Sequence, residues 1–414
     1  MPKLLQINSC IKGSTGSIAQ NIGNLAIKHG WESWIAYSGR EPQTESLSHL
    51  IAIGSKYVSQ LHALETRLFD RHGFGSNCAT KHLIEKIEEV RPDIIHLHNI
   101  HGYYININVL FEYLSKTDIP IVWTLHDCWA FTGHCVHFTD VCCNKWMNSA
   151  PEHCSMCPKK KGYPSSLFFD RSHKNYYQKK ELFTSPKKLT VVPVSYWLGS
   201  VVKHSFLNKY PIHVIQNGID INAFVPKKDI VCKVRDKYRL GDKFVIIGVA
   251  KGWSDDVGLH VFYKLREVLD EDYAIVMVGL TQKQIADLPA GITGITHTNP
   301  KELVELYNAA NVLFNGSFQE TFGLVTAESM ACGTPVIVYN STACPEIVDS
   351  DRGRIVPVGN FEKLLEAIRS LKELSQNEKE QMSAKCVEYV RKNLDKNNKY
   401  QEYINLYNSL LGNE

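Results

Sequence analysis

The sequence predicts an α/β protein that consists of two doubly wound domains in tandem. Short apolar runs alternate with amphipathic segments along the whole chain of 414 residues, and such alternation is typical of parallel sheets covered by helices on both faces. A chain of this length is too long for one ordinary hydrophobic core. Its content of 44% hydrophobic and 21% charged residues is that of a globular protein.

We expect the first domain to span residues 1–195 and the second to span residues 212–394. The C-terminal helix, residues 395–414, is expected to pack back on the first domain. Strands are expected in the first domain at 3–8, 34–37, 51–53, 94–98, 121–125 and 189–194, with helices at 17–29, 80–90 and 109–115. Strands are expected in the second domain at 244–250, 274–278, 292–296, 312–314 and 336–339, with helices at 259–269, 301–310, 322–332 and 361–374.

Composition limits the function classes. The formal net charge of +3 is too small to indicate nucleic-acid binding. No apolar run is long enough to cross a bilayer, and the N-terminus lacks the features of a signal peptide, so we expect a cytoplasmic protein. In that compartment the twelve cysteines indicate thiols or metal ligands rather than disulfides.

The stretch from Phe318 to Val348 carries the strongest functional signal. Glu320 precedes an expected short helix and Glu328 lies inside it; the seven residues between them make about two turns, so both carboxyl groups can face one crevice. Thr321 is the expected N-cap. The start of this helix is a suitable place for an anion, because its N–H groups and dipole are positive.

Three further segments follow expected strands. Gly13 and Gly16 lie in a loop that opens the first helix, where glycine lets the backbone approach a ligand; an ordinary strand-to-helix turn is an equal alternative. His126 follows the strand at 121–125, and we expect it in a site, whereas His96 should point inward. Lys251 follows the strand at 244–250, where it can neutralise phosphate charge.

Asn217 and Gly218 head the second domain. An Asn-Gly pair is typical of a tight turn with positive φ, and on its own it indicates no more than a turn.

A cysteine-rich segment follows His126. Four thiolates from Cys135, Cys142, Cys154 and Cys157 can supply a structural zinc site, with Cys143 as an alternative to Cys142. The spacing is not that of a standard zinc finger, and a lid with free thiols remains the alternative. Four thiolates leave no open position, so a catalytic metal is not expected.

The motifs at 217–220, Lys251, Glu320 to Glu328 and the Gly-Thr-Pro-Val run at 333–336 occur in an order that resembles retaining glycosyltransferases of the GT-B fold, in particular glycosyltransferase family 4. The segment 124–135 and the cysteines after it resemble a subgroup that builds bacterial surface polysaccharides. The resemblance covers essentially the whole chain. It implies two Rossmann-like domains that face each other across a cleft.

The resemblance also implies roles for individual residues. Glu320 would lie by the transferred sugar, Lys251 on the donor phosphates and His126 near the reacting face of the sugar. Glu328 would hold the ribose, and the base would lie against the loop at 296–298. The donor-binding residues implied by the family motifs are Gly13, Gly16, Asn217, Gly218, Thr298, Thr321, Phe322, Gly323, Leu324 and Glu328.

One position departs from the family pattern. Val257 stands where the family usually has a second basic residue, in the segment 255–259. Loss of that cation should weaken stabilisation of the leaving group by roughly a few kcal/mol. Lys12 and Arg40 are candidates to replace it.

By resemblance, the expected reaction is transfer of a hexosyl unit, with retention of configuration, from a UDP- or GDP-linked sugar to a growing glycan. Lys251 and the helix dipole would stabilise the leaving diphosphate, so no catalytic cofactor is expected. A GT-B epimerase and a non-catalytic glycan- or nucleotide-binding relative are the alternatives. A polyprenyl-diphosphate-linked acceptor would bring the protein to the inner face of the cell membrane, where lysines 159–161 and 187–188 can touch anionic lipid; a solvated charge run is the alternative.

Overall fold

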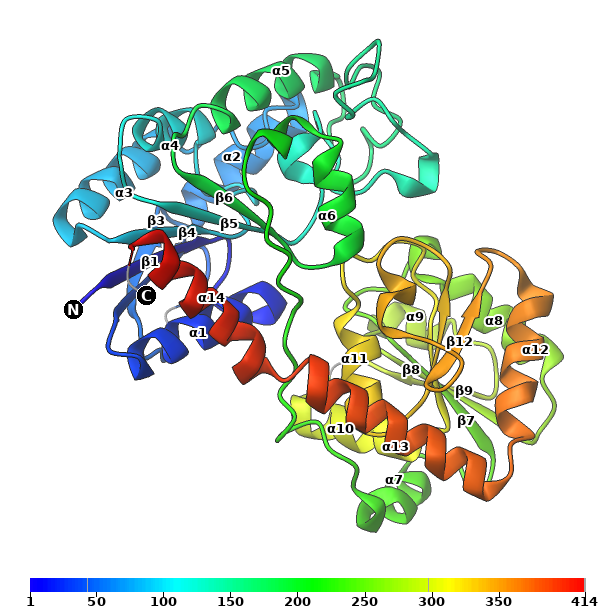
Figure 1. Cartoon of the computed structure of the whole chain (residues 1–414). Helices are drawn as coiled ribbons and strands as arrows, with labels where there is room; N and C mark the ends of the chain where they lie inside the picture. The colour runs from blue at the N-terminus through cyan, green and yellow to red at the C-terminus, as the bar shows by residue number, and fades with distance from the viewer. Residues whose placement is uncertain (43, 297, 413–414) are drawn as a thin grey trace. The chain divides into compact units, whose positions relative to one another are not determined.

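The structure is a computed structural model, and it describes residues 1–42, 44–296 and 298–412. It divides into two compact units. Unit 1 contains residues 1–216 together with the C-terminal residues from Lys399, and unit 2 contains Asn217–Asn398 (Figure 1). The segment 196–216, which lies beyond the boundary expected from the sequence, therefore belongs to unit 1.

Unit 1 is built on a six-stranded parallel sheet with strand order β3-β2-β1-β4-β5-β6. Every residue of β4, β5 and β6 is buried, which explains why these strands read as continuous apolar runs. The strands are β1 (Lys3–Asn8), β2 (Glu32–Ser38), β3 (His49–Ile53), β4 (Ile94–Leu97), β5 (Ile121–Leu125) and β6 (Leu189–Pro193). The helices are α1 (Gly13–Lys28), α2 (Lys56–Phe69), α3 (Asn77–Val90), α4 (Ile107–Leu114), α5 (Ser172–Phe183), α6 (Tyr196–Lys203) and the C-terminal α14 (Lys396–Leu410), with single 3-10 turns at η1 (Trp129–Phe131), η2 (Thr139–Val141) and η3 (Phe206–Lys209).

Helix α14 completes the core of unit 1. Its buried side chains Tyr400, Tyr403, Ile404 and Tyr407 share one hydrophobic cluster with Leu4 and Ile94 of the sheet and with α1. Figure 1 shows α14 and α1 close together beside β1. The Tyr407 hydroxyl lies 2.7 Å from His96 Nδ1, so the end of the chain also bonds to the inside of the sheet.

Unit 2 repeats the design with strand order β12-β11-β10-β7-β8-β9, again all parallel. The edge strand β12 is missing from the sequence-based expectation because it is short, contains Arg354 and exposes Ile355. The strands are β7 (Phe244–Val249), β8 (Tyr273–Val278), β9 (Ile292–Ile295), β10 (Val312–Asn315), β11 (Val336–Tyr339) and β12 (Gly353–Val356). The helices are α7 (Val231–Lys237), α8 (Leu259–Val268), α9 (Gln282–Ala286), α10 (Pro300–Ala309), α11 (Leu324–Ala331), α12 (Phe361–Lys372) and α13 (Gln376–Asn393), with 3-10 turns at η4 (Lys228–Ile230), η5 (Asp255–Val257) and η6 (Cys344–Ile347).

Both sheets reverse their strand order once. The reversal lies between β1 and β4 in unit 1 and between β10 and β7 in unit 2. Ligands of doubly wound sheets bind beyond the carboxyl ends of the strands at such a reversal. The two reversals are therefore the places to look for functional side chains.

Candidate active site

In unit 2, two loops meet at the reversal of strand order. The loop after β7 leads through η5 into α8, and the loop after β10 leads into α11. The Phe318 N–H donates to the Asp256 carbonyl over 3.0 Å. Gly258 and Gly316 touch so closely that a Cβ on Gly258 would stand 2.9 Å from the Gly316 oxygen. The two loops therefore form one surface.

Glu320 lies in the second of these loops and is partly buried. Its backbone is fixed from both sides, because its N–H donates to Thr342 Oγ1 over 2.9 Å and its carbonyl accepts from the Ala343 N–H over 3.2 Å. Burial raises the pKa of its carboxyl group to about 7, although hydrogen bonds from Ser317 and Asn315 act in the opposite direction. Glu320 is thus a positioned carboxyl group that titrates near neutral pH.

Helix α11 starts later than the sequence suggests. The N-cap is Gly323 rather than Thr321, and the helix covers Leu324–Ala331. Gly323 has φ +88°, a left-handed conformation that favours glycine. Glycine carries no side chain that could cap the helix, and a helix start without a capping side chain is a suitable place for an anion.

Glu328 lies in the middle of α11 and is partly buried. The Tyr307 hydroxyl of α10 donates to Glu328 Oε2 over 3.1 Å. Burial raises the pKa of Glu328 to about 7 against the effect of this hydrogen bond. Tyr307 itself is fully buried, so it holds the carboxylate in a fixed orientation. The sequence motif does not reveal Tyr307.

Two positions after β7, Lys251 and Val257, concern the positive charge expected at the phosphate site. Lys251 is exposed and follows the end of β7, next to the reversal. Val257 ends η5 and packs against the core of unit 2. The position that usually carries a second cation in the family therefore has a structural role here.

The Asn217-Gly218 pair corrects the sequence analysis. Gly218 does not have the positive φ expected of a tight turn: the described glycines with positive φ do not include it. Glycine is required because a Cβ there would lie 2.3 Å from Lys396 Cα. The segment pairs with 394–396 through Ile219, and Asp220 forms an ion pair with Lys396 at 2.6 Å. The motif joins two segments of unit 2 that are far apart in the sequence.

Thr298 is partly buried in the loop between β9 and α10. Its neighbour at position 297, part of the loop expected to contact the base, lies outside the described residues. β9 is an edge strand two places from β7, and α10, which follows this loop, carries Tyr307. Thr298 thus remains a prediction.

In unit 1, histidines follow the ends of β4 and β5. His126 Nε2 lies 3.1 Å from His98 Nδ1, and His98 Nε2 lies 3.1 Å from Gln6 Oε1. Burial lowers the pKa of His126 to about 4, so the imidazole is neutral at pH 7 and this hydrogen-bonded chain fixes its orientation. His96 is fully buried, which confirms its expected inward direction.

A histidine–aspartate pair beyond the carboxyl ends of β4 and β5 was not expected from the sequence. His101 Nε2 lies 2.7 Å from Asp127 Oδ2. Burial raises the pKa of Asp127, but the charge and the hydrogen bond of His101, together with the Trp129 N–H and the charge of His137, outweigh burial and bring the pKa to about 2. The sequence signal for this pair is that a histidine and an aspartate follow neighbouring strands. The sequence does not show which histidine pairs with Asp127.

The two glycines of the first loop have different roles. A Cβ on Gly16 would lie 2.4 Å from the Ile11 carbonyl carbon, so packing requires glycine there. Gly13 begins α1 with φ +75°, and open space surrounds the place of its absent Cβ. Of the two, Gly13 is the position open to a ligand.

The cysteines gather around one small cavity in unit 1. Cys135, Cys143, Cys154 and Cys157 line it, together with Trp146. Cys142, which was expected from the sequence to be a zinc ligand, is exposed and does not line the cavity. The backbone of Cys142 is left-handed with φ 48°, and this turn leaves its neighbour Cys143 to line the cavity.

Comparison with known proteins now decides the family. The model of Glycosyltransferase Family 4 matches residues 17–223, half of the chain, and the model of Glycosyl transferases group 1 matches residues 235–393. The chain belongs to glycosyltransferase family 4. It has the GT-B fold, as its two parallel sheets show.

Several known proteins are similar to this family 4 chain, some of them over its full length. The putative colanic acid biosynthesis glycosyl transferase WcaC of Escherichia coli is 25% identical over 98% of this chain and 100% of its own. The O-antigen chain mannosyltransferase RfbU of Salmonella typhimurium is 27% identical over 43% of this chain and 52% of its own. Among solved structures, sucrose-phosphate synthase of Thermosynechococcus elongatus has a TM-score of 0.72 at 14% identity with full coverage of both chains. Anabaena HepE in complex with UDP-glucose has a TM-score of 0.68 at 14% identity and covers 98% of this chain and 99% of its own.

Within the part of the chain that the structure describes, no helix is both long and apolar enough to span a membrane.

Proposed function

We propose that this chain is a retaining glycosyltransferase that moves a hexosyl unit from a nucleotide-diphosphate sugar to a growing glycan in the biosynthesis of a cell-surface polysaccharide. The observation that carries the proposal is the arrangement around the start of α11. Glu320 stands before this helix start and Glu328 within the helix, and each carboxyl group has a pKa near 7 because it is buried.

The two carboxyl groups suit the two sugars of such a donor. Each keeps acceptor capacity beyond the few hydrogen bonds that it receives from the protein. Hexose and ribose hydroxyls are hydrogen-bond donors that a buried carboxylate can accept. We assign the hexose to Glu320 and the ribose to Glu328, whose orientation Tyr307 fixes.

The diphosphate between these sugars needs positive charge. The N-terminus of α11 supplies N–H groups and a dipole, and Lys251 supplies an exposed ammonium group. Both act on the leaving diphosphate as negative charge develops there, and the diphosphate in turn takes the proton of the acceptor hydroxyl on the same face of the sugar. Because Val257 contributes no cation, the helix start carries a larger share of this stabilisation.

The proposed donor and acceptor classes rest on similar proteins. HepE is described in complex with UDP-glucose, and RfbU is named a mannosyltransferase of the O-antigen chain. A UDP- or GDP-linked hexose and a growing surface glycan, linked to polyprenyl diphosphate, are therefore the substrates that we propose. From unit 1 we assign His126 and Gly13 to the reacting sugar and the acceptor.

An exposed apolar surface on unit 1 supports contact with a membrane at the cytoplasmic side. On α2 the exposed side chains Tyr57, Leu61 and Leu64 recur at helical spacing, and Phe168 and Phe169 are exposed in the loop before α5. The two parts are connected, because the Phe69 and Phe169 rings stack with centroids 5.9 Å apart. The lysines at 159–161 lie in the same loop. Apolar side chains beside lysines fit the surface of anionic lipid.

Membrane contact is tested by co-sedimentation with vesicles that contain anionic lipid. We expect the full chain to pellet with these vesicles and Leu61→Glu/Phe168→Glu to remain in the supernatant. Equal pelleting of both proteins would remove this part of the proposal, and the sugar transfer would be unaffected by that result.

The central proposal is tested in two steps. A screen of nucleotide sugars for protection against thermal unfolding identifies the donor without knowledge of the acceptor. Transfer is then measured as release of nucleoside diphosphate with a lipid-linked acceptor, for the wild type and for Glu320→Ala. Equal rates for the two proteins would overturn the proposal, and donor binding without any release would favour the non-catalytic alternative.

A further inference from the structure

The segment between β5 and α5, residues 126–171, is the longest part of unit 1 with little regular structure: it holds the short turns η1 and η2. It also holds six of the twelve cysteines of the chain, and all of these are free thiols. Its own apolar packing is a small cluster of Phe131, Phe138 and Trp146. A segment of this kind needs another source of stability.

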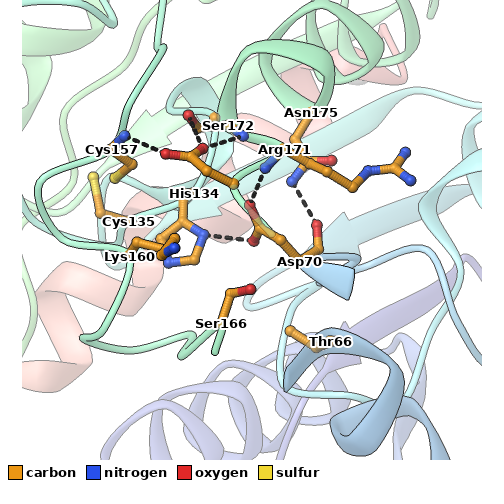
Figure 2. Close-up of polar contacts among 12 residues, drawn as sticks. Thr66, Asp70, His134, Cys135, Cys157, Lys160, Ser166, Arg171, Ser172 and Asn175 are labelled. Carbon is orange, nitrogen blue, oxygen red and sulfur yellow. Dashed lines mark hydrogen bonds and ion pairs between the residues drawn. The ribbon is translucent and has the colours of Figure 1, made fainter. Parts of the chain in front are cut away.

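Four of its cysteines surround one small cavity. Cys135, Cys143, Cys154 and Cys157 come from three separate stretches of the segment, yet all four line the same small cavity. Cys135 and Cys157 are hydrogen-bonded to each other through their side chains. Figure 2 shows these two residues beside the buried His134–Asp70 pair.

The backbone around the cavity donates to the sulfur atoms. The Gly133 N–H donates to Cys154 Sγ over 3.2 Å, and the backbone N–H of Lys159 donates to the Cys157 sulfur. Hydrogen bonds from N–H groups favour sulfur in its negatively charged form, which is the form that ligates metal, whereas burial acts in the opposite direction and raises the pKa of Cys154 to about 12. Both donors are backbone N–H groups, and they are a second observation beside the position of the four cysteines around one cavity.

The surroundings hold the cavity firmly in place. His134 Nδ1 lies 2.6 Å from Asp70 Oδ1, and this pair is buried (Figure 2). Asp70 also accepts from the Arg171 N–H over 2.7 Å, and Asp170 accepts from the Cys157 N–H over 2.6 Å. His134 and the C-terminal end of the segment are therefore fixed to the end of α2 next to the cavity.

We propose that Cys135, Cys143, Cys154 and Cys157 bind one Zn²⁺ ion in a closed, structural site. In the described residues no three Cys, His, Asp or Glu side chains yet stand at the spacing of a metal-ligand set. Closer approach of protonated thiols brings little stabilisation. Zn²⁺ replaces the thiol protons and draws four sulfur atoms into a tetrahedron. Closure needs the four cysteine side chains, which already line one cavity, to move closer together.

Four thiolates make this site structural rather than catalytic, because they leave no position for water or substrate. The ion would tie the loop after η1 to the Cys154–Cys157 turn. It would thereby steady a segment that includes Asp127 at one end and the exposed Phe168 and Phe169 at the other. The proposal is independent of the donor chemistry proposed for unit 2.

The neighbouring residues Cys142 and Cys143 provide a matched test. We expect the purified full-length chain to contain one equivalent of zinc by elemental analysis. Cys142→Ser should keep that equivalent, and Cys143→Ser should lose it. Equal loss in both variants, or zinc retained in Cys143→Ser, would overturn the proposed ligand set.

A second measurement does not depend on the folding of a variant. Wild-type protein produced with Co²⁺ in place of Zn²⁺ should show the intense visible absorption of a tetrahedral four-thiolate centre, and a chelator should lower the unfolding temperature of unit 1. Wild-type protein that contains no metal, with either four titratable thiols or a Cys135–Cys157 disulfide in peptide mapping, would overturn the proposal.

Discussion

Glu320 and Asp127 follow the carboxyl ends of buried parallel strands in the two units, yet their environments differ in one decisive respect. Asp127 has an imidazole partner, His101, at 2.7 Å, and its pKa falls to about 2. Within the described residues neither Glu320 nor Glu328 forms an ion pair, and the pKa of each rises to about 7 because of burial. The carboxyl group of unit 1 is satisfied by the protein itself, whereas those of unit 2 are left for a ligand.

The largest expected effect is a pH dependence of the stability of unit 2. The folded pKa values of Glu320 and Glu328 lie above the ordinary value of 4.5. The folded state therefore binds more protons between pH 4.5 and 7, so stability falls as pH rises through this range, by up to about 3 kcal/mol for each carboxyl group. Calorimetric unfolding between pH 4.5 and 8 measures this slope.

A Glu320→Gln/Glu328→Gln double variant isolates the effect. Its stability should change little over the same range. Asp127 does not contribute to the slope, because its lowered pKa confines its effect to acid below about pH 4. A double variant with the slope of the wild type would show that other groups titrate.

Asp127→Asn should destabilise unit 1 by about 3 kcal/mol at pH 7, because it removes the charge that pairs with a buried histidine. Urea unfolding followed by a signal from unit 1 measures the loss. The exposed Asp118 stands before β5, and Asp118→Asn serves as the control, with an expected change near zero. Equal stability of Asp127→Asn and the control would contradict the comparison.

Glu320→Gln should act in the opposite direction at pH 8. It removes a buried negative charge that has no cationic partner among the described residues, so we expect a gain of about 2 kcal/mol in the free energy of unfolding. Transfer activity should fall on the order of 100-fold, because the contact with the sugar is lost. Glu388→Gln on the exposed face of α13 is the control for both measurements. A less stable or fully active Glu320→Gln variant would refute the assignment.

Tyr307→Phe should produce the smallest effect. It removes one hydrogen bond to Glu328, so the affinity for nucleotide should fall about fivefold, equivalent to about 1 kcal/mol. Fluorescence or calorimetric titration with the nucleoside diphosphate measures this change. Tyr263→Phe on α8 should bind nucleotide as the wild type does.

Much of the fold could be predicted from the sequence, because buried parallel strands are continuous apolar runs. β1, β5 and β11 have the predicted boundaries. β12 was missed because an edge strand with Arg354 and an exposed Ile355 lacks that pattern. Helix α2 was missed because its exposed face is apolar, which obscures the usual helical periodicity.

The candidate site was predictable only where local sequence determines it. The positions of Glu320 and Lys251 follow from strand ends, which local patterns reveal. The requirement for glycine at 218 depends on Lys396, far along the chain. Similarly, Tyr307 reaches Glu328 from another helix, and only the tertiary structure distinguishes Cys143 from Cys142.

The central claim is that Glu320 and Glu328, which have no ion-pair partner among the described residues, divide one donor between them. Calorimetric titration of the wild type, Glu320→Gln and Glu328→Gln with a nucleoside diphosphate and with the matching nucleotide sugar tests it most directly. We predict that Glu328→Gln weakens the binding of both ligands, and that Glu320→Gln weakens the binding of the nucleotide sugar alone. Unchanged affinity of Glu328→Gln for the nucleoside diphosphate would contradict the account.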